Sequence, residues 1–242
     1  MKSKPELIIS YIDEIRRIIN SKVQRIGTSI KKNNKTTKKV IQEQLRTTNE
    51  NYWGFICTSM DLIGDTAYAI KNIEDSGFYG PTKIKNWGEL YLRLFGFLTS
   101  IYLQQNTVIT LFKCLNVPGL NILKTKIEKL KLRDIRNKIA SHNTDYLIKH
   151  TNEVDTYNFN ADSLDGGVLL IGSYTKDIFE EINIFKELKE HYEIILDSLD
   201  AILEKIIKTI YKPNKEKQKE FLDELELLRS ERKGNLVIRL KK

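Results

Sequence analysis

The chain has 242 residues and a formal net charge of +8, with 40% hydrophobic and 30% charged residues. This length suits one large domain, or one domain with an appendage, and the composition is that of a soluble globular protein. Four prolines, twelve glycines and no fixed-period repeat argue against long linkers, low-complexity segments and a solenoid. No run of eighteen apolar residues occurs, so no membrane-spanning helix and no membrane partner are expected.

The sequence predicts a cytoplasmic protein without a metal site. The segment that begins Met1-Lys-Ser-Lys lacks the uninterrupted apolar core of a signal peptide. Cys57 and Cys114 stand far apart in apolar surroundings, which is typical of small buried side chains in a reducing compartment. No Cys/His group has zinc-ligand spacing, and no cofactor motif is found, so no metal or cofactor is expected.

The positive charge is distributed unevenly. Residues 1–46 hold twelve Lys/Arg against four Asp/Glu, and residues 113–138 hold eight against two. Residues 177–231 are acidic, with nine against fifteen. The two basic segments would attract an anionic partner such as RNA, or they form a solvated Lys-rich surface.

Helices dominate the first half of the chain. Apolar residues at helical spacing predict a helix over 5–32, a second over about 37–73 and a third over about 87–116. The loop Asp75–Pro81 separates the second from the third. The third helix is apolar almost throughout, which is typical of the centre of a bundle.

The second half mixes both kinds of element. A fourth helix is predicted over about 123–141 and a fifth over about 176–211, with a shorter helix after Pro213. Between them, alternating residues around Asp165-Gly166-Gly167 predict a β-hairpin at about 155–175. The fold class is therefore all-α, an antiparallel helical bundle with a small hairpin insertion.

The segment 133–144, Arg-Asp-Ile-Arg-Asn-Lys-Ile-Ala-Ser-His-Asn-Thr, holds the main candidate functional residues. One side of its helix is formed by Leu132, Ile135, Ile139 and His142. Arg136 and His142 lie at opposite edges of this stripe, roughly 120° apart at about 100° per residue. Two copies of the helix related by a two-fold axis could bring these edges together, with the stripes packed against each other. Asp134 and Lys138 are spaced as an i,i+4 ion pair.

These residue types suit RNA cleavage without a metal. Arginine binds a phosphate through its planar fork, and histidine moves protons near neutral pH. Ordinary roles are also open: Arg136 could form a surface salt bridge, and His142 could cap the helix C-terminus, where a cation is favoured.

The arrangement Arg136-Asn137-Lys-Ile-Ala-Ser141-His142 resembles the Arg…His motif of the HEPN superfamily of helical nucleases and nucleotide-binding proteins. Upstream, the segment 87–106 (Trp-Gly-Glu-Leu-Tyr through Gln104-Gln105-Asn106) resembles a helix of uncharacterised bacterial HEPN-like proteins. In that group the motif reads Arg-Asn-x-x-x-Gly-His-Pro-Thr, so Ser141 and Asn143 here replace Gly and Pro. The two segments lie within a stretch of about 60 of the 242 residues.

The resemblance implies a single HEPN-like domain over 1–242, with a C-terminal helical extension at about 213–242. It implies a homodimer whose motif helices line a basic cleft and cut RNA without a metal. His142 would be the general base or acid, Arg136 would stabilise the phosphate, and Asn137 would orient it. The product would be a 2′,3′-cyclic phosphate. Such proteins often act in toxin–antitoxin or antiphage defence systems, so an antitoxin or defence partner protein is implied.

Further polar residues could contribute to the cleft. The set comprises Arg133, Lys138, Ser141, Asn143, Gln104 and Gln105. Gln104 and Gln105 interrupt an apolar run, so they are either part of the cleft wall or a buried hydrogen-bonded cluster. Glu89 is a candidate for orienting the arginine. His150 and His191 have no companion residues and are expected at the surface.

Aromatic side chains are a further candidate feature. Tyr52, Trp53 and Tyr91 could stack bases, or they belong to the core, as aromatic residues in such helices usually do.

Three functions follow from these observations. The leading one is a metal-independent endoribonuclease. The second is a non-catalytic HEPN-like dimer that binds RNA, a nucleotide or a partner protein, and the third is a purely structural bundle subunit. Arg136 and His142 together in a basic dimer cleft would favour the enzyme, whereas a motif buried within one monomer would favour the other two.

Overall fold

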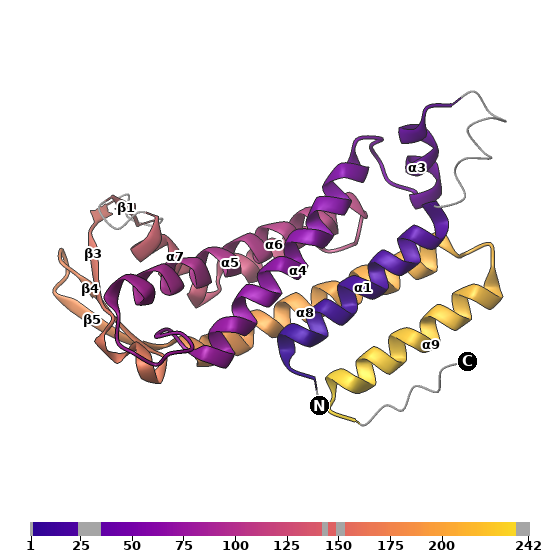
Figure 1. Ribbon diagram of the computed structural model, residues 1–242. Coiled ribbons are helices and arrows are strands. Elements are labelled where there is room, and N and C mark those ends of the chain that lie inside the picture. The colour runs from indigo at the N-terminus through magenta and orange to yellow at the C-terminus, as the bar shows by residue number, and fades with distance from the viewer. Residues whose placement is uncertain (1, 24–34, 142–144, 149–152, 236–242) are drawn as a thin grey trace. The chain divides into compact units, whose positions relative to one another are not determined.

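The computed structural model describes residues 2–23, 35–141, 145–148 and 153–235 (Figure 1). The described chain is mostly helical, as predicted. Its α-helices are α1 (Lys4–Val23), α3 (Thr37–Leu45), α4 (Tyr52–Ser76), α5 (Trp87–Cys114), α6 (Leu120–Glu128), α7 (Lys131–Ala140), α8 (Ile184–Ile210) and α9 (Lys215–Arg232). Among the helices of the described ranges, none combines the length and the apolar character that crossing a membrane requires.

The chain folds into two compact units. Unit 1 consists of Met1–Ala67, Asn106–Leu123 and Ile195–Lys242, and unit 2 consists of Tyr68–Gln105 and Lys124–Ile194. Helices α4, α5 and α8 contribute residues to both units.

Unit 1 is built on the amphipathic helix α1. The helix begins at a capping box, in which the backbone N–H of Glu6 donates to Ser3 Oγ at 3.4 Å and the N–H of Ser3 donates to Glu6 Oε2 at 2.8 Å. The predicted apolar face of α1 is buried, and at most 2% of each side chain is exposed at Leu7, Ile8, Ile12, Ile15 and Ile19. Burial of this face, rather than helix propensity, supplies most of the stability of such a helix.

Unit 2 contains the β-structure. Strands β3 (Tyr157–Asn160), β4 (Val168–Ser173) and β5 (Ile178–Asn183) form an antiparallel sheet in the order β3-β4-β5, and β1 (Tyr146–Leu147) pairs with β2 (Val154–Asp155). The predicted hairpin is therefore confirmed, with the short 3₁₀ helix Asp162–Gly166 in its connection. The register pairs Phe159 with Ile171 and Ile171 with Glu180, so these three side chains share one face of the sheet.

The third strand corrects one prediction. Residues 178–183 form β5 and not the start of a helix at Lys176, and α8 begins only at Ile184. The Asn183 side chain accepts a hydrogen bond from the backbone N–H of Lys186 at 2.9 Å, which is the N-cap arrangement. Ile178 and Ile182 are spaced four apart and fit a helix or a strand, so only pairing with β4 decides between the two.

Two predicted helices are each divided in two. The segment 37–73 breaks after α3 because Arg46 adopts the left-handed conformation (φ 55°), and the Asn49 side chain accepts from the N–H of Asn51 at 2.8 Å before α4 begins. The segment 123–141 divides at Leu130, which precedes α7 in an extended conformation without a side-chain cap. Leu130 is 2% exposed, so tertiary burial, and not a capping residue, accompanies this second break.

Candidate functional site

Helix α7 carries the motif, and its apolar stripe is buried within the chain. Leu132, Ile135 and Ile139 are 1%, 0% and 2% exposed. The expectation that this stripe packs against a second copy of the helix is therefore wrong, because residues of the same chain already cover it. A second copy would have to approach α7 from another side.

Arg136 lies half-buried against an aromatic ring. Its Cζ is 4.0 Å from the centroid of Tyr102 on α5, and its Nη1 donates to Oδ1 of Asn137 at 3.2 Å. Its Nε–H is buried without a hydrogen-bond partner. Among the described residues, no carboxylate lies within ion-pair distance of Arg136, so its charge is balanced only by the ring and by an amide.

Arg133, one helical turn earlier, lies over the same ring. Its Cζ is 4.6 Å from the Tyr102 centroid, and its Nη1 donates to Oε1 of Gln105 at 3.2 Å. Burial lowers the pKa of Arg133, and the neighbouring charge of Arg136 lowers it further. Two guanidinium groups on one ring form a local excess of positive charge, which favours an anion.

Behind Arg133 lies a buried polar cluster made of Gln104, Gln105 and His191, each with 0% exposure. His191 Nε2 lies 2.9 Å from Gln104 Oε1, and His191 Nδ1 lies 3.3 Å from Gln105 Nε2. These partners fit a neutral imidazole that carries its proton on Nε2 and accepts at Nδ1. Burial lowers the pKa of His191 to about 3. The cluster thus connects α8 through α5 to Arg133 on α7.

The other cations of α7 are paired with carboxylates. The predicted i,i+4 pair is confirmed, with Lys138 Nζ 2.8 Å from Asp134 Oδ2, and Asp134 also accepts from the Tyr146 hydroxyl at 2.9 Å. Lys131 Nζ lies 2.6 Å from Glu180 Oε1 on β5. Lys138 also lies 5.0 Å from the ring centroid of Tyr157. Arg136 is therefore the cation of this helix best placed to meet an external anion.

The remaining predicted residues divide into three groups. Ser141 is the exposed C-cap residue of α7, and its N–H donates to the carbonyl of Asn137. His142, Asn143 and His150 lie outside the described residues. Glu89 lies 3.5 Å from Arg93 Nη1, so its neighbour is a different arginine from the one predicted.

Two important residues were not recognised from the sequence. The expectation that His191 is a surface position is wrong, because it is fully buried between two glutamines. Its position among the buried residues Leu188, Ile195 and Leu199 was the available signal, since all lie on one face of α8. Tyr102 stands one turn before Gln105 on α5, but nothing in the sequence shows that two arginines lie over its ring.

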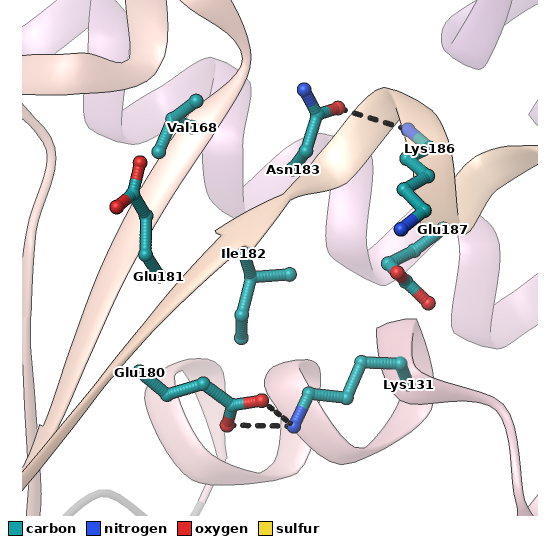
Figure 2. A pocket seen from close by; sticks show the side chains of 8 residues that line it. All are labelled: Lys131, Val168, Glu180, Glu181, Ile182, Asn183, Lys186 and Glu187. Atoms are coloured by element: carbon teal, nitrogen blue, oxygen red, sulfur yellow. Dashed lines mark hydrogen bonds and ion pairs between the residues drawn. The ribbon is translucent and has the colours of Figure 1, made fainter.

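A separate hollow of about 490 Å³ lies beside the sheet (Figure 2). It is lined by Lys131, Val168, Glu180, Glu181, Ile182, Asn183, Lys186 and Glu187. Figure 2 shows the Glu180 carboxylate directed at the Lys131 ammonium, so this pair neutralises itself. Two further glutamates stand against one further lysine, and this balance does not favour a phosphate.

Within the described ranges, no three His, Cys, Asp or Glu side chains group as metal ligands would. Comparison of the chain with models of known families, with curated proteins and with solved structures gave no match. The chemistry proposed below is therefore supported by the residues of this chain and by the resemblance of its motif.

Proposed function

We propose that the chain is a metal-independent endoribonuclease of the HEPN type, in which Arg136 binds the scissile phosphate. The observation that carries this proposal is the state of Arg136, a half-buried guanidinium without a described carboxylate partner, held on the Tyr102 ring. A preorganised cation of this kind stabilises the negative charge that develops on phosphate oxygens during displacement.

The reaction would be an internal transfer within RNA. The ribose 2′-oxygen attacks the adjacent phosphorus, the bond to the 5′-oxygen breaks, and a 2′,3′-cyclic phosphate and a free 5′-hydroxyl result. His142, two residues beyond the end of α7, acts as general base on the 2′-OH or as general acid on the leaving oxygen. Asn137 accepts from the Arg136 Nη1–H and so orients the guanidinium.

A second candidate function is a non-catalytic protein that binds RNA or a nucleotide through the same arginine. The burial of Leu132, Ile135 and Ile139 favours it, because the dimer expected to unite Arg136 with His142 used this stripe. A catalytic homodimer must therefore pair through another face of α7. A role in defence or with an antitoxin is supported by the resemblance alone.

RNA cleavage in EDTA tests the proposal. Wild type is compared with the Arg136→Ala and His142→Ala variants on a panel of 5′-labelled single-stranded and structured RNAs. Arg16→Ala is the matched control, because Arg16 pairs with Asp13 and Asp61 at the surface of unit 1. We expect cleavage to persist in EDTA, to leave cyclic phosphate ends, and to be lost in both motif variants but not in the control. Folded wild type that cuts none of the panel would leave the binding function as the better proposal.

A further inference from the structure

The outer face of α5 carries a row of exposed aromatic side chains, here called the aromatic row and defined as Trp87, Tyr91 and Phe95. They are 45%, 37% and 38% exposed. Neighbouring rings are nearly parallel, with centroids 6.1 Å apart at an angle of 26° and 6.2 Å apart at 23°. Three large rings exposed in sequence on one helix form an apolar surface of the kind that marks an interaction site.

The sheet extends this surface. Phe159 on β3 meets the rings of Tyr91 and Phe95 edge to face, with centroids 5.8 and 6.1 Å away. Two residues earlier on the same strand, and therefore on the same face, Tyr157 lies beside the ammonium of Lys138. Helix α7 and β3 lie against each other, so a cation of α7 stands beside a ring of β3 in this part of unit 2.

The aromatic row leads towards the two arginines. At about 100° per residue, Trp87, Tyr91, Phe95 and Tyr102 fall within about 80° of one another on α5. At about 1.5 Å per residue, Tyr102 lies about 10 Å along the helix from Phe95 and about 22 Å from Trp87. Tyr102, whose ring lies against Arg133 and Arg136, is thus on the same side of α5 as the row, although Leu98 between Phe95 and Tyr102 is fully buried.

We infer that the aromatic row is a base-stacking surface for single-stranded RNA whose phosphate is bound at Arg136. This inference rests on the proposed function, because both use Arg136 as the phosphate anchor. Every base has a flat π-face, so exposed rings bind single strands without sequence readout, while cations hold the backbone. A length of about 22 Å accommodates roughly six nucleotides at about 3.4 Å each.

The charges favour RNA over a second protein surface. Arg136 lies on the Tyr102 ring, beyond the Phe95 end of the row, and lacks a described carboxylate partner. At the other end Lys85 Nζ lies 4.3 Å from the Trp87 centroid and also pairs with Asp162 at 2.9 Å. The nearby carboxylates of Asp134 and Glu180 are occupied by Lys138 and Lys131. A polymer that combines flat aromatic units with negative charge complements this arrangement.

Fluorescence anisotropy with 5′-labelled 2′-O-methyl RNA tests the inference, because this RNA binds but cannot undergo 2′-OH attack. Probes of three, six and twelve nucleotides are titrated in EDTA. We expect affinity to rise from three to six nucleotides and then to level off. The double variant Tyr91→Ala with Phe95→Ala should bind at least about ten-fold more weakly, since each stacked ring contributes about 5- to 150-fold.

Matched variants separate stacking from general damage. Phe179→Ala removes a ring that is 63% exposed on the opposite face of the same sheet, and we expect binding within about two-fold of wild type. Tyr91→Phe with Phe95→Tyr keeps both rings and should keep the affinity. An abasic twelve-unit phosphodiester has the charge without the bases, so wild type and the double alanine variant should bind it equally.

The outcomes also separate this inference from the ribonuclease. Equal binding of 2′-O-methyl RNA by wild type and the double alanine variant would contradict base stacking on the aromatic row, even if the wild type cuts RNA. If binding depends on the aromatic row but the wild type cuts no RNA, base stacking on the row is supported and the ribonuclease activity is contradicted. A wild-type dimer that the double alanine variant turns into a monomer in sedimentation, with RNA affinity unchanged, would assign the row to a protein contact instead.

Discussion

Arg229 in unit 1 and Arg136 in unit 2 are both half-buried arginines, but their surroundings differ. Arg229 lies 2.5 Å from Asp200, 2.7 Å from Glu204 and 2.6 Å from Glu226, and hydrogen bonding to Asp200 is the main cause of its raised pKa. Arg136 has an aromatic ring and one amide. The charge of Arg229 is balanced by carboxylates of its own chain, whereas Arg136 has no such partner among the described residues and is available to an anionic ligand.

The same contrast extends to other polar groups of the two units. In unit 1 the carboxylate of Asp200 accepts from the Tyr11 hydroxyl at 3.0 Å as well as from Arg229. In unit 2 the buried carboxylate of Asp155 is held by hydroxyl groups, and the buried His191 is held by amides. In unit 1 an ion-pair network thus joins the helices, whereas in unit 2 these two buried groups are held by the hydroxyl and amide groups of uncharged side chains.

Replacing each of these two arginines by lysine should change a different property of the protein. Arg136→Lys keeps the charge but loses the planar fork, so we expect RNA cleavage to fall by about 100-fold or more, with little change in the free energy of unfolding. Arg229→Lys should leave cleavage unchanged and lower the free energy of unfolding by about 1–2 kcal/mol. Cleavage rates and urea unfolding of both variants are measured together. If Arg136→Lys cuts at the wild-type rate, Arg136 has no role in the transition state.

The buried cluster should make the protein sensitive to mild acid. The pKa of His191 is about 3 in the folded chain, below the ordinary value of 6.5, because the imidazole is buried. Between these values the unfolded chain binds the proton and the folded chain does not, so stability falls as the pH drops below 6.5. From pH 6.5 to 4.5 the loss is about 2 kcal/mol.

Urea unfolding at several pH values measures this loss. His191→Gln cannot titrate, and it should lose correspondingly less stability than wild type over the same range. The carboxylates titrate in both proteins, so the difference between the two curves isolates His191. Parallel curves would contradict the assignment of a neutral histidine.

Asp155 should stabilise unit 2 in a lower pH range. Burial alone would raise the pKa of Asp155, but hydrogen bonds from Thr175, Ser173, Tyr157 and the N–H of Thr156 lower it to about 2. This contribution is present above the ordinary pKa and is lost as the pH falls towards 2. Asp155→Asn should lower the free energy of unfolding at pH 7 by about 1–3 kcal/mol. Thermal unfolding checks this, and an unchanged Tm would mean that the hydroxyl partners serve the amide equally well.

The sequence was sufficient for elements that one local pattern determines. The face of α1, the helix α5 and the β3–β4 hairpin follow from spacing of 3.6 or 2 residues and from glycine at the turn. The break at Leu130 and the strand β5 were not predictable, because each depends on partners distant in sequence. Leu130 is extended and buried without a cap, and β5 is decided by its pairing with β4.

Only those parts of the candidate site that belong to a local pattern were predicted from the sequence. Arg133, Arg136 and Asn137 stand in a recognisable motif, and Gln104 and Gln105 are conspicuous in an apolar helix. Their contacts are tertiary: α8 supplies His191, and α5 places Tyr102 under α7. A histidine between hydrophobic residues does not reveal its partners, so the sequence could not show that the glutamines hold it.

Replacing the Tyr102 ring, which lies against both arginines, should weaken function only modestly. Tyr102→Leu removes the aromatic face from Arg133 and Arg136, and a partly buried cation–π contact contributes about 0.5–2 kcal/mol. We therefore expect RNA binding and cleavage to weaken by about 2- to 30-fold, while Tyr102→Phe, which keeps the ring, stays closer to wild type. The two variants are compared in the anisotropy and cleavage assays. Equal activity of both would mean that α7 alone orients the arginines. A loss confined to Tyr102→Leu would show that the aromatic ring orients Arg136, as carboxylates orient Arg229. Unlike a carboxylate, the ring carries no negative charge, so the Arg136 guanidinium stays able to bind an anion.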